Sequence, residues 1–156
     1  MGDSNLSFKV LFVCAENTCR SQMAEGFARQ LGLDANSAGI KSGVAVNPAA
    51  IRVMAEVGID VSAQSAKSIS APEISRRLSS RLLSSGTGET DTDPPDSAYD
   101  AVVSLCSVNT SAFCPAAYSG IQLNWNIEDP WGQPLPAFRR IRDEIGEKVA
   151  QLARTR

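Results

Sequence analysis

Apolar residues occur along the chain in short runs that alternate with segments of helical spacing. Residues 8–13 form a run rich in β-branched and aromatic side chains, which is typical of a strand buried on both faces of a parallel sheet. Similar runs at 99–106 and 121–127 predict two further buried strands, and residues 36–40 predict a shorter one. Each of the first two long runs delivers a cysteine, Cys14 or Cys106, at its carboxyl end.

Helical spacing follows the first two predicted strands and recurs at the end of the chain. Residues 23–31 repeat apolar positions at helical intervals before Gly32, and a second helix is expected from residue 48 to 57, closed by Gly58. The C-terminal segment carries one apolar stripe, which predicts a helix facing the core, at Phe138, Ile141, Ile145, Val149 and Leu152. The alternation of strand and helix predicts an α/β domain.

Residues 79–97 interrupt this alternation, because Ser, Gly, Thr, Asp and Pro dominate them. This composition predicts a solvated, flexible insertion with no catalytic part. The 156 residues, 43% of them hydrophobic, otherwise suit a single domain over 1–156 with one buried core. We expect it to be a monomer.

Charge and hydropathy exclude several functional classes. A net charge of -2 provides no basic field for nucleic acid or an anionic membrane, so an anion has to be held by a local site. No apolar run approaches the roughly 20 residues that span a bilayer, and the N-terminus lacks a signal peptide. We therefore expect a cytoplasmic protein that binds neither nucleic acid nor membrane.

The chain has four cysteines and no histidine. In a reducing compartment, cysteines serve catalysis, redox cycling or metal binding more often than structural disulfides. Without histidine, proton transfer falls to a carboxylate, and Cys-His nucleophile pairs are excluded. A zinc module is an alternative, but the intervals Cys14 to Cys19 and Cys106 to Cys114 do not match common zinc spacing, so we expect no metal.

The segment from Cys14 to Ser21 has the pattern Cys-x5-Arg-Ser and lies between a predicted strand and a predicted helix. Folded around an anion, such a loop directs its backbone N–H groups inward, and the helix dipole adds positive potential. Arg20 can grip two anion oxygens, and the same surroundings favour a nucleophilic Cys14 thiolate. The remaining loop residues are the expected substrate-binding set: Ala15, Glu16, Asn17, Thr18, Cys19 and Ser21.

Several of these loop residues also have simpler interpretations. Ser21 can donate a hydrogen bond to the Cys14 thiolate and Asn17 can brace the loop, yet both are ordinary turn and capping residues. Cys19 has no evident role in the loop, so we expect it to be a buried, chemically unreactive thiol.

Residues 10–27, Val-Leu-Phe-Val-Cys-x-x-Asn-Thr-Cys-Arg-Ser-Gln-Met-Ala-Glu-Gly-Phe, resemble the low-molecular-weight tyrosine phosphatases and their arsenate reductase relatives. Similar segments continue downstream at 36–40, 46–48, 56–60, 100–106, 129–130 and 139–145. The resemblance implies a four-stranded parallel sheet flanked by helices, with the anion loop after the first strand. It also implies that Cys14 is the nucleophile, Arg20 the oxyanion clamp and Asp129 the acid.

Cysteines beyond the loop separate the two branches that this resemblance implies. A phosphatase needs one thiolate and water, whereas reducing arsenate takes two electrons, which a pair of thiols can provide. Cys106 and Cys114 stand where thioredoxin-linked reductases carry further redox cysteines, although their interval is one residue longer than is typical. We therefore favour arsenate as substrate, with phosphate or sulfate as competing anions, over aryl phosphate hydrolysis through a phosphocysteine.

The implied mechanism is a relay of thiolates. Cys14 attacks arsenate, Cys106 attacks Cys14 as arsenite leaves, and Cys114 takes over the disulfide after residues 107–113 shift. No bound cofactor is expected, and the reductant is external, either thioredoxin or glutathione with glutaredoxin.

A second implication of the resemblance concerns a cation near the loop. Some of these reductases bind potassium through residues matching Asn17, Glu25, Ser37 and a downstream acid. Lys67 stands where that acid falls, and one hypothesis is that its ammonium replaces the ion by pairing with Glu25; the alternative is an exposed Lys67 with no such role.

Overall fold

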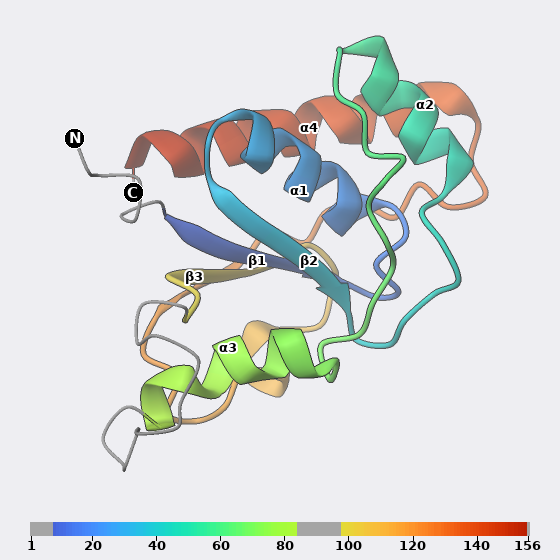
Figure 1. Cartoon of the computed structure of the whole chain (residues 1–156). Helices are drawn as coiled ribbons and strands as arrows, with labels where there is room; N and C mark the ends of the chain where they lie inside the picture. Colours follow the sequence, from blue (N-terminus) through green and yellow to red (C-terminus); the bar gives the residue numbers. More distant parts are fainter. Residues whose placement is uncertain (1–7, 84–97, 156) are drawn as a thin grey trace.

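The computed structural model describes residues 8–83 and 98–155 and centres on a parallel sheet in the order β2-β1-β3-β4 (Figure 1). The predicted fold, a four-stranded parallel sheet with flanking helices, is confirmed. Two strands are shorter than the apolar runs at 99–106 and 121–127, because the chain leaves the sheet early to form the site. The strands are β1 (Lys9–Cys14), β2 (Asp34–Gly39), β3 (Ala101–Ser104) and β4 (Ile121–Asn124).

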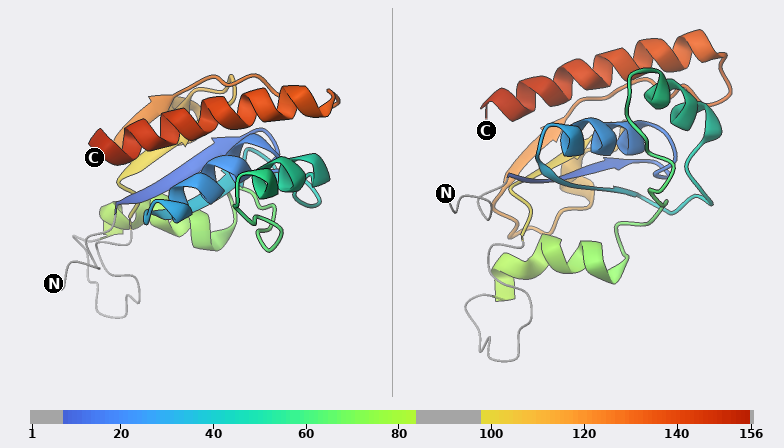
Figure 2. Two further views of the ribbon diagram at one scale, coloured as in Figure 1. Left: turned by 90° about the horizontal axis from the view of Figure 1, so that it is seen from above. Right: turned by 45° about the horizontal axis from the view of Figure 1, so that its top comes forward.

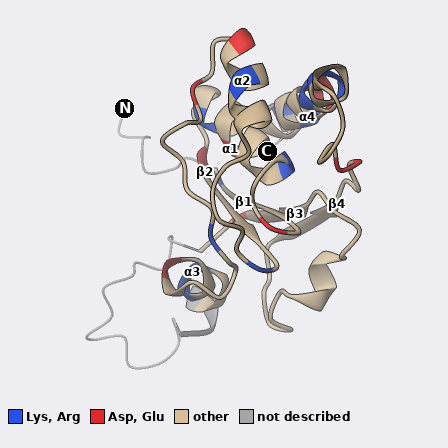
Figure 3. Ribbon diagram, turned by 90° about the vertical axis from the view of Figure 1, so that its right-hand side faces the viewer, with Lys and Arg blue, Asp and Glu red and all other residues tan. Residues whose placement is uncertain are grey.

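Helices cover both faces of the sheet, as the view along it in Figure 3 and the views in Figure 2 show. One face carries α1 (Arg20–Gln30), α2 (Pro48–Glu56) and α4 (Leu135–Thr155), and the other carries α3 (Pro72–Leu83). Alternate residues of β1 enter the two resulting cores, Val10 and Phe12 on the α1 side and Leu11 and Val13 on the α3 side. Burial on both faces explains why the strand is continuously apolar.

Helices α1, α2 and α4 form where the sequence predicts them. Gly32 ends α1 with a φ of 89°, a left-handed conformation that glycine adopts without steric cost. The predicted apolar stripe of α4 is buried, with exposed fractions of 7% or less at Phe138, Ile141, Ile145, Val149 and Leu152. Among the described residues, no helix is both long enough and apolar enough to cross a membrane.

Helix α3 was not predicted from the sequence. It buries Ile74 and Leu78 against the second face of the sheet, and it begins at Pro72. The helix continues to Leu83, so the prediction of a loop from residue 79 is wrong for residues 79–83. The remainder of that predicted insertion, 84–97, lies outside the described residues.

The central strands β1 and β3 place two cysteines at one edge of the sheet. The two strands pair in parallel, with Val13 opposite Ser104, and the Leu105 N–H donates to the Val13 carbonyl at 2.7 Å. Their carboxyl ends therefore meet, which is where open α/β sheets bind ligands. Cys14 ends β1, and Cys106 follows β3 by two residues.

Candidate active site

The loop after β1 is held from outside through its carbonyl groups. The segment at 40–47 donates backbone N–H groups to the carbonyls of Cys14, Ala15, Glu16 and Thr18, at 2.8 to 3.1 Å. Gly39 immediately precedes this segment, and a Cβ there would clash with the backbone of the loop. Because these carbonyls point outward to their donors, the loop is left with its amide side facing inward.

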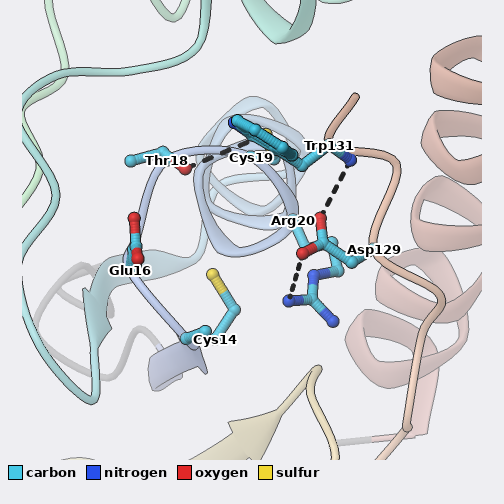
Figure 4. A pocket seen from close by; sticks show the side chains of 8 residues that line it. Cys14, Glu16, Thr18, Cys19, Arg20, Asp129 and Trp131 are labelled. Carbon is cyan, nitrogen blue, oxygen red and sulfur yellow. Dashed lines mark hydrogen bonds and ion pairs between the residues drawn. The ribbon is translucent and has the colours of Figure 1, made fainter. Parts of the chain in front are cut away.

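Residues of the loop line a cavity of about 320 Å³. Within the described parts of the chain, the N–H groups of residues 15–19 have no hydrogen-bond acceptor. Such a ring of amides at the start of α1 is suited to an anion. Figure 4 shows the Cys14 sulfur directed toward the turn of the loop, with Arg20 and Asp129 together on one side of it. The lining residues are Cys14, Ala15, Glu16, Thr18, Cys19, Arg20, Asp129 and Trp131.

Behind the cavity, Ser21 and Asn17 support the nucleophile without lining the cavity themselves. Asn17 is fully buried at a φ of 62° and donates from Nδ2 to Ser21 Oγ at 2.8 Å. Ser21 Oγ lies 2.9 Å from Cys14 Sγ, and a thiolate there can only accept the serine proton. Gln22 donates to the Asn17 carbonyl, and the Lys67 N–H donates to Asn17 Oδ1. The expected side-chain contacts, from Ser21 to Cys14 and from Asn17 within the loop, are therefore both present.

Arg20 has one terminal nitrogen bound to backbone carbonyls and one nitrogen without a partner. Its Nη1 donates to the carbonyls of Leu105 and Ile127, at 3.3 and 2.8 Å. Its Nε is buried and has no partner. A buried donor without an acceptor is costly, so Nε indicates an oxygen ligand in the cavity. Nε and Nη2 form the fork that binds two oxygens of one anion.

Asp129 lies across the cavity from the loop. Its Oδ2 is 3.6 Å from Arg20 Nη2, and its Oδ1 accepts the Trp131 N–H at 3.0 Å. The side chain is 53% exposed, so it can exchange protons with solvent. Trp131 also lines the cavity and is 70% exposed. Trp131 was not predicted as part of the site, although it lies only two residues after the predicted acid.

Cys106 opens into a second cavity beside the first, of about 600 Å³. Ala15, Arg20 and Asp129 line both cavities, so a second thiol adjoins the wall of the anion site. Ser107 and Val108 extend the second cavity on the Cys106 side, and Lys41 contributes a cation to its lining.

Comparisons with known proteins agree with this arrangement. The family model for low molecular weight phosphotyrosine protein phosphatase matches residues 9–77. The chain is 37% identical over 147 residues to a "Glutaredoxin arsenate reductase" of Synechocystis sp., covering 92% of this chain and 95% of that one. It is also 37% identical over 150 residues to an arsenate reductase of Bacillus anthracis, covering 94% of each.

The chain belongs to the arsenate reductases of the low-molecular-weight phosphatase family. A solved arsenate reductase in the phosphate binding state is 37% identical, with a TM-score of 0.68, and the match covers 94% of this chain and 96% of that one. A low molecular weight protein tyrosine phosphatase from T. tengcongensis matches at 27% identity with the same TM-score, covering 96% and 100%. Proteins with this fold therefore include both reductases and phosphatases, and the cysteines outside the loop are the feature that distinguishes the two reactions.

In this member of the family, Cys114 lies apart from Cys106. Cys106 packs with the core beneath α1 and α4, whereas Cys114 packs against the core beneath α3, on the other face of the sheet. Burial raises the pKa of the Cys114 thiol to about 11. Cys114 lines neither of the two cavities around Arg20, so the structure does not bring the last predicted member of the relay to the site.

Cys19 is buried in the anion loop, as the sequence predicted. Burial raises the pKa of its thiol to about 12, and the contact from Thr18 Oγ1 at 3.9 Å acts in the opposite direction. At neutral pH it is therefore a neutral thiol, which is a poor nucleophile.

The prediction that Lys67 pairs with Glu25 is wrong. Glu25 forms the i,i+4 ion pair with Arg29 at 2.7 Å and accepts the Ser37 hydroxyl. The Lys67 ammonium instead donates to the Ser65 carbonyl at 2.9 Å. Burial lowers the pKa of Lys67, and the nearby Glu25 carboxylate opposes this change. Over residues 8–83 and 98–155, no three side chains of the metal-ligating types gather into a metal site.

Proposed function

We propose that the protein reduces arsenate to arsenite, with Cys14, Cys106 and Cys114 acting in turn. The observation that carries this proposal is the pair of cavities that share Arg20 and Asp129, one containing Cys14 and the other Cys106. Hydrolysis of a phosphate ester requires only the first cavity. A second thiol beside it supports a reaction that consumes two thiols and transfers two electrons.

The first step is substitution at arsenic. Arsenate binds to the loop N–H groups and to Nε and Nη2 of Arg20, and the Cys14 thiolate attacks the arsenic. One arsenate oxygen leaves as water after receiving a proton from Asp129, which is the carboxyl group of the cavity on the side away from the loop. An S–As bond forms and an As–O bond breaks, and arsenic stays at oxidation state five.

The second step is the redox step. The Cys106 thiolate attacks Cys14 Sγ, so that an S–S bond forms and the S–As bond breaks. The electron pair of the broken bond stays on arsenic, which leaves as arsenite, while the two sulfurs are oxidised to a disulfide. Phosphorus does not accept such an electron pair, so phosphate and sulfate act only as competing anions in the first cavity.

The third step regenerates Cys14. The Cys114 thiolate attacks Cys106, which releases the Cys14 thiolate and leaves a Cys106–Cys114 disulfide for an external thiol reductant. Because the two cysteines pack on different faces of the sheet, residues 107–113 have to rearrange for this exchange. The reductant is thioredoxin or the glutathione and glutaredoxin pair, and such reductants operate in the reducing cytoplasm, where we place the protein as a monomer.

Aryl phosphate hydrolysis is a second candidate activity, and Trp131 favours it. The exposed indole borders the anion cavity, where it can stack against the ring of an aryl ester. Cys14, Arg20 and Asp129 would serve both reactions, so the two activities can coexist in one site.

Cysteine variants separate the two reactions in one set of assays. Arsenate turnover is measured with a thioredoxin system and with glutathione plus glutaredoxin, and hydrolysis of an aryl phosphate is measured in parallel. Cys14→Ser should abolish both activities, whereas Cys106→Ser should abolish arsenate turnover and spare hydrolysis. Cys19→Ala is the matched control and should spare both. Arsenate turnover that persists in Cys106→Ser would contradict the relay, and full turnover of Cys114→Ser with glutaredoxin would remove Cys114 from it.

A further inference from the structure

Ser104, the last residue of β3, is a fully buried polar side chain next to the second thiol. Its hydroxyl lies 2.5 Å from the Val108 carbonyl, 3.3 Å from the Cys106 carbonyl and 3.6 Å from Cys106 Sγ. All three contacts are to the turn that carries Cys106 away from the sheet. The serine therefore touches both the reacting sulfur and the backbone that positions it.

The serine hydroxyl has a single proton for these three acceptors. The short contact to the Val108 carbonyl identifies that oxygen as the acceptor when Cys106 is a neutral thiol. A thiolate is a stronger acceptor than a neutral carbonyl, because hydrogen bonds to charged groups are about twice as strong. A change of acceptor requires only that the hydroxyl hydrogen rotates about the Cβ–Oγ bond, which it does freely in serine.

We propose that Ser104 is a positioning residue that donates its proton to the Val108 carbonyl in the resting enzyme and to Cys106 Sγ when Cys106 is a thiolate. Donation to sulfur prepares Cys106 for attack and releases the Val108 carbonyl at the same time. The release loosens the start of residues 107–113, the segment that separates Cys106 from Cys114. Activation of the second thiol and mobility of the segment after it are thus coupled through one proton.

The role in turnover rests on the proposed reduction of arsenate, but the hydrogen bond to sulfur does not. Other charged groups also face Cys106 across its cavity: Arg20, Lys41, Glu128 and Asp129. They come from the anion loop, the segment after β2 and the segment after β4, and they remain unchanged when only Ser104 is replaced. A comparison of Ser104 variants therefore isolates the hydroxyl from the general electrostatics of the cavity.

The test uses the full chain with Cys106 as its sole cysteine, made by Cys14→Ser, Cys19→Ala and Cys114→Ser. The rate of Cys106 alkylation by iodoacetamide is followed against pH, and the midpoint of that profile is the measurement. Ser104→Ala should raise the midpoint by roughly one pH unit, because the thiolate loses a charge-assisted hydrogen bond. Ser104→Thr retains the hydroxyl and should restore the midpoint. Ser119→Ala is the matched control, since that serine is exposed and lines neither of the two cavities.

A merely structural role for Ser104 predicts a different result. Loosening of the turn would change the alkylation rate at every pH and leave the midpoint where it was, and that outcome would overturn the proposal. If Ser104→Ala fails to fold, Ser104→Thr and Ser104→Val give the same comparison with side chains of equal shape. In the chain with all four cysteines, Ser104→Ala should slow arsenate turnover at least tenfold and spare aryl phosphate hydrolysis. Wild-type protein that shows no arsenate turnover would defeat the proposed function but leave the alkylation result valid.

Discussion

Replacement of Arg20 by lysine retains the positive charge of the anion cavity but removes its fork. In the structure, Nη1 of Arg20 is occupied by the Leu105 and Ile127 carbonyls, which leaves Nε and Nη2 for the anion. A lysine ammonium at the same position donates from one point, so it can replace one of the two hydrogen bonds to the anion but not both. The guanidinium is 7% exposed, so water cannot easily supply the missing donor.

The expected loss follows from the number of donors removed. One charge-assisted hydrogen bond contributes about 1.5–3 kcal/mol, and about 1.4 kcal/mol corresponds to a tenfold change. Arg20→Lys should therefore lower kcat/KM for arsenate by roughly 10- to 150-fold. Arg20→Met removes both bonds, about 3–6 kcal/mol, and should lower kcat/KM by at least roughly 150-fold.

The assay measures arsenate turnover with saturating reductant, and the dissociation constant of inorganic phosphate is measured in parallel by calorimetry. Both should weaken in the order wild type, Arg20→Lys, Arg20→Met, because the same fork holds both anions. Arg52→Lys on α2 is the matched control, since that side chain is exposed. Turnover of Arg20→Lys within twofold of the wild type would refute the assignment of Nε and Nη2 to the anion.

Three further predictions concern the acid, the inert thiol and the packing of α2. Asp129→Asn should slow arsenate turnover by about 100-fold or more and leave phosphate affinity nearly unchanged, because it removes the proton donor; equal loss of both would indicate a structural role. Because burial holds the pKa of Cys19 near 12, above its ordinary value of 9.0, its effect on stability is constant below pH 9 and becomes unfavourable from pH 9 to 12. Denaturant titrations of wild type and Cys19→Ala should therefore agree in pH dependence below pH 9 and diverge above it. Arg139 holds the pKa of Glu56 near 2, below its ordinary 4.5, so this carboxylate stabilises the fold above about pH 4.5 and stops doing so as the pH falls toward 2. Glu56→Gln should flatten the acid limb of the stability profile, and an unchanged limb would contradict the pairing.

The sequence pattern of apolar residues predicted those elements in which the same pattern of burial continues from end to end. The apolar run of β1 is buried on both faces, and the stripe of α4 faces a single core, so period and composition were sufficient for both. Helix α3 escaped prediction because only Ile74 and Leu78 of its first two turns are buried, which leaves a weak apolar pattern. The helix lies where it does because the apolar residues on the second face of the sheet have to be shielded from water.

Pairings between distant side chains were beyond the reach of the sequence. The expectation that Lys67 meets Glu25 was wrong because Arg29 lies one helical turn away from that carboxylate and forms the pair first. The hydrogen bonds from Arg20 to the Leu105 and Ile127 carbonyls could not be predicted either, because strand pairing sets where those oxygens lie.

What the sequence by itself determined is the local design of the loop. The Cys-x5-Arg-Ser pattern between strand and helix predicts an oxyanion site, because backbone amides, helix dipole and guanidinium are all local to residues 14–21. Tertiary structure decided how the other cysteines relate to that loop. Parallel pairing of β1 and β3 places Cys106 at the same edge of the sheet as Cys14, whereas Cys114 packs on the opposite face of the sheet. The positions of these two cysteines depend on which strands pair and on which face of the sheet each following turn packs. Neither is encoded within a short stretch of chain.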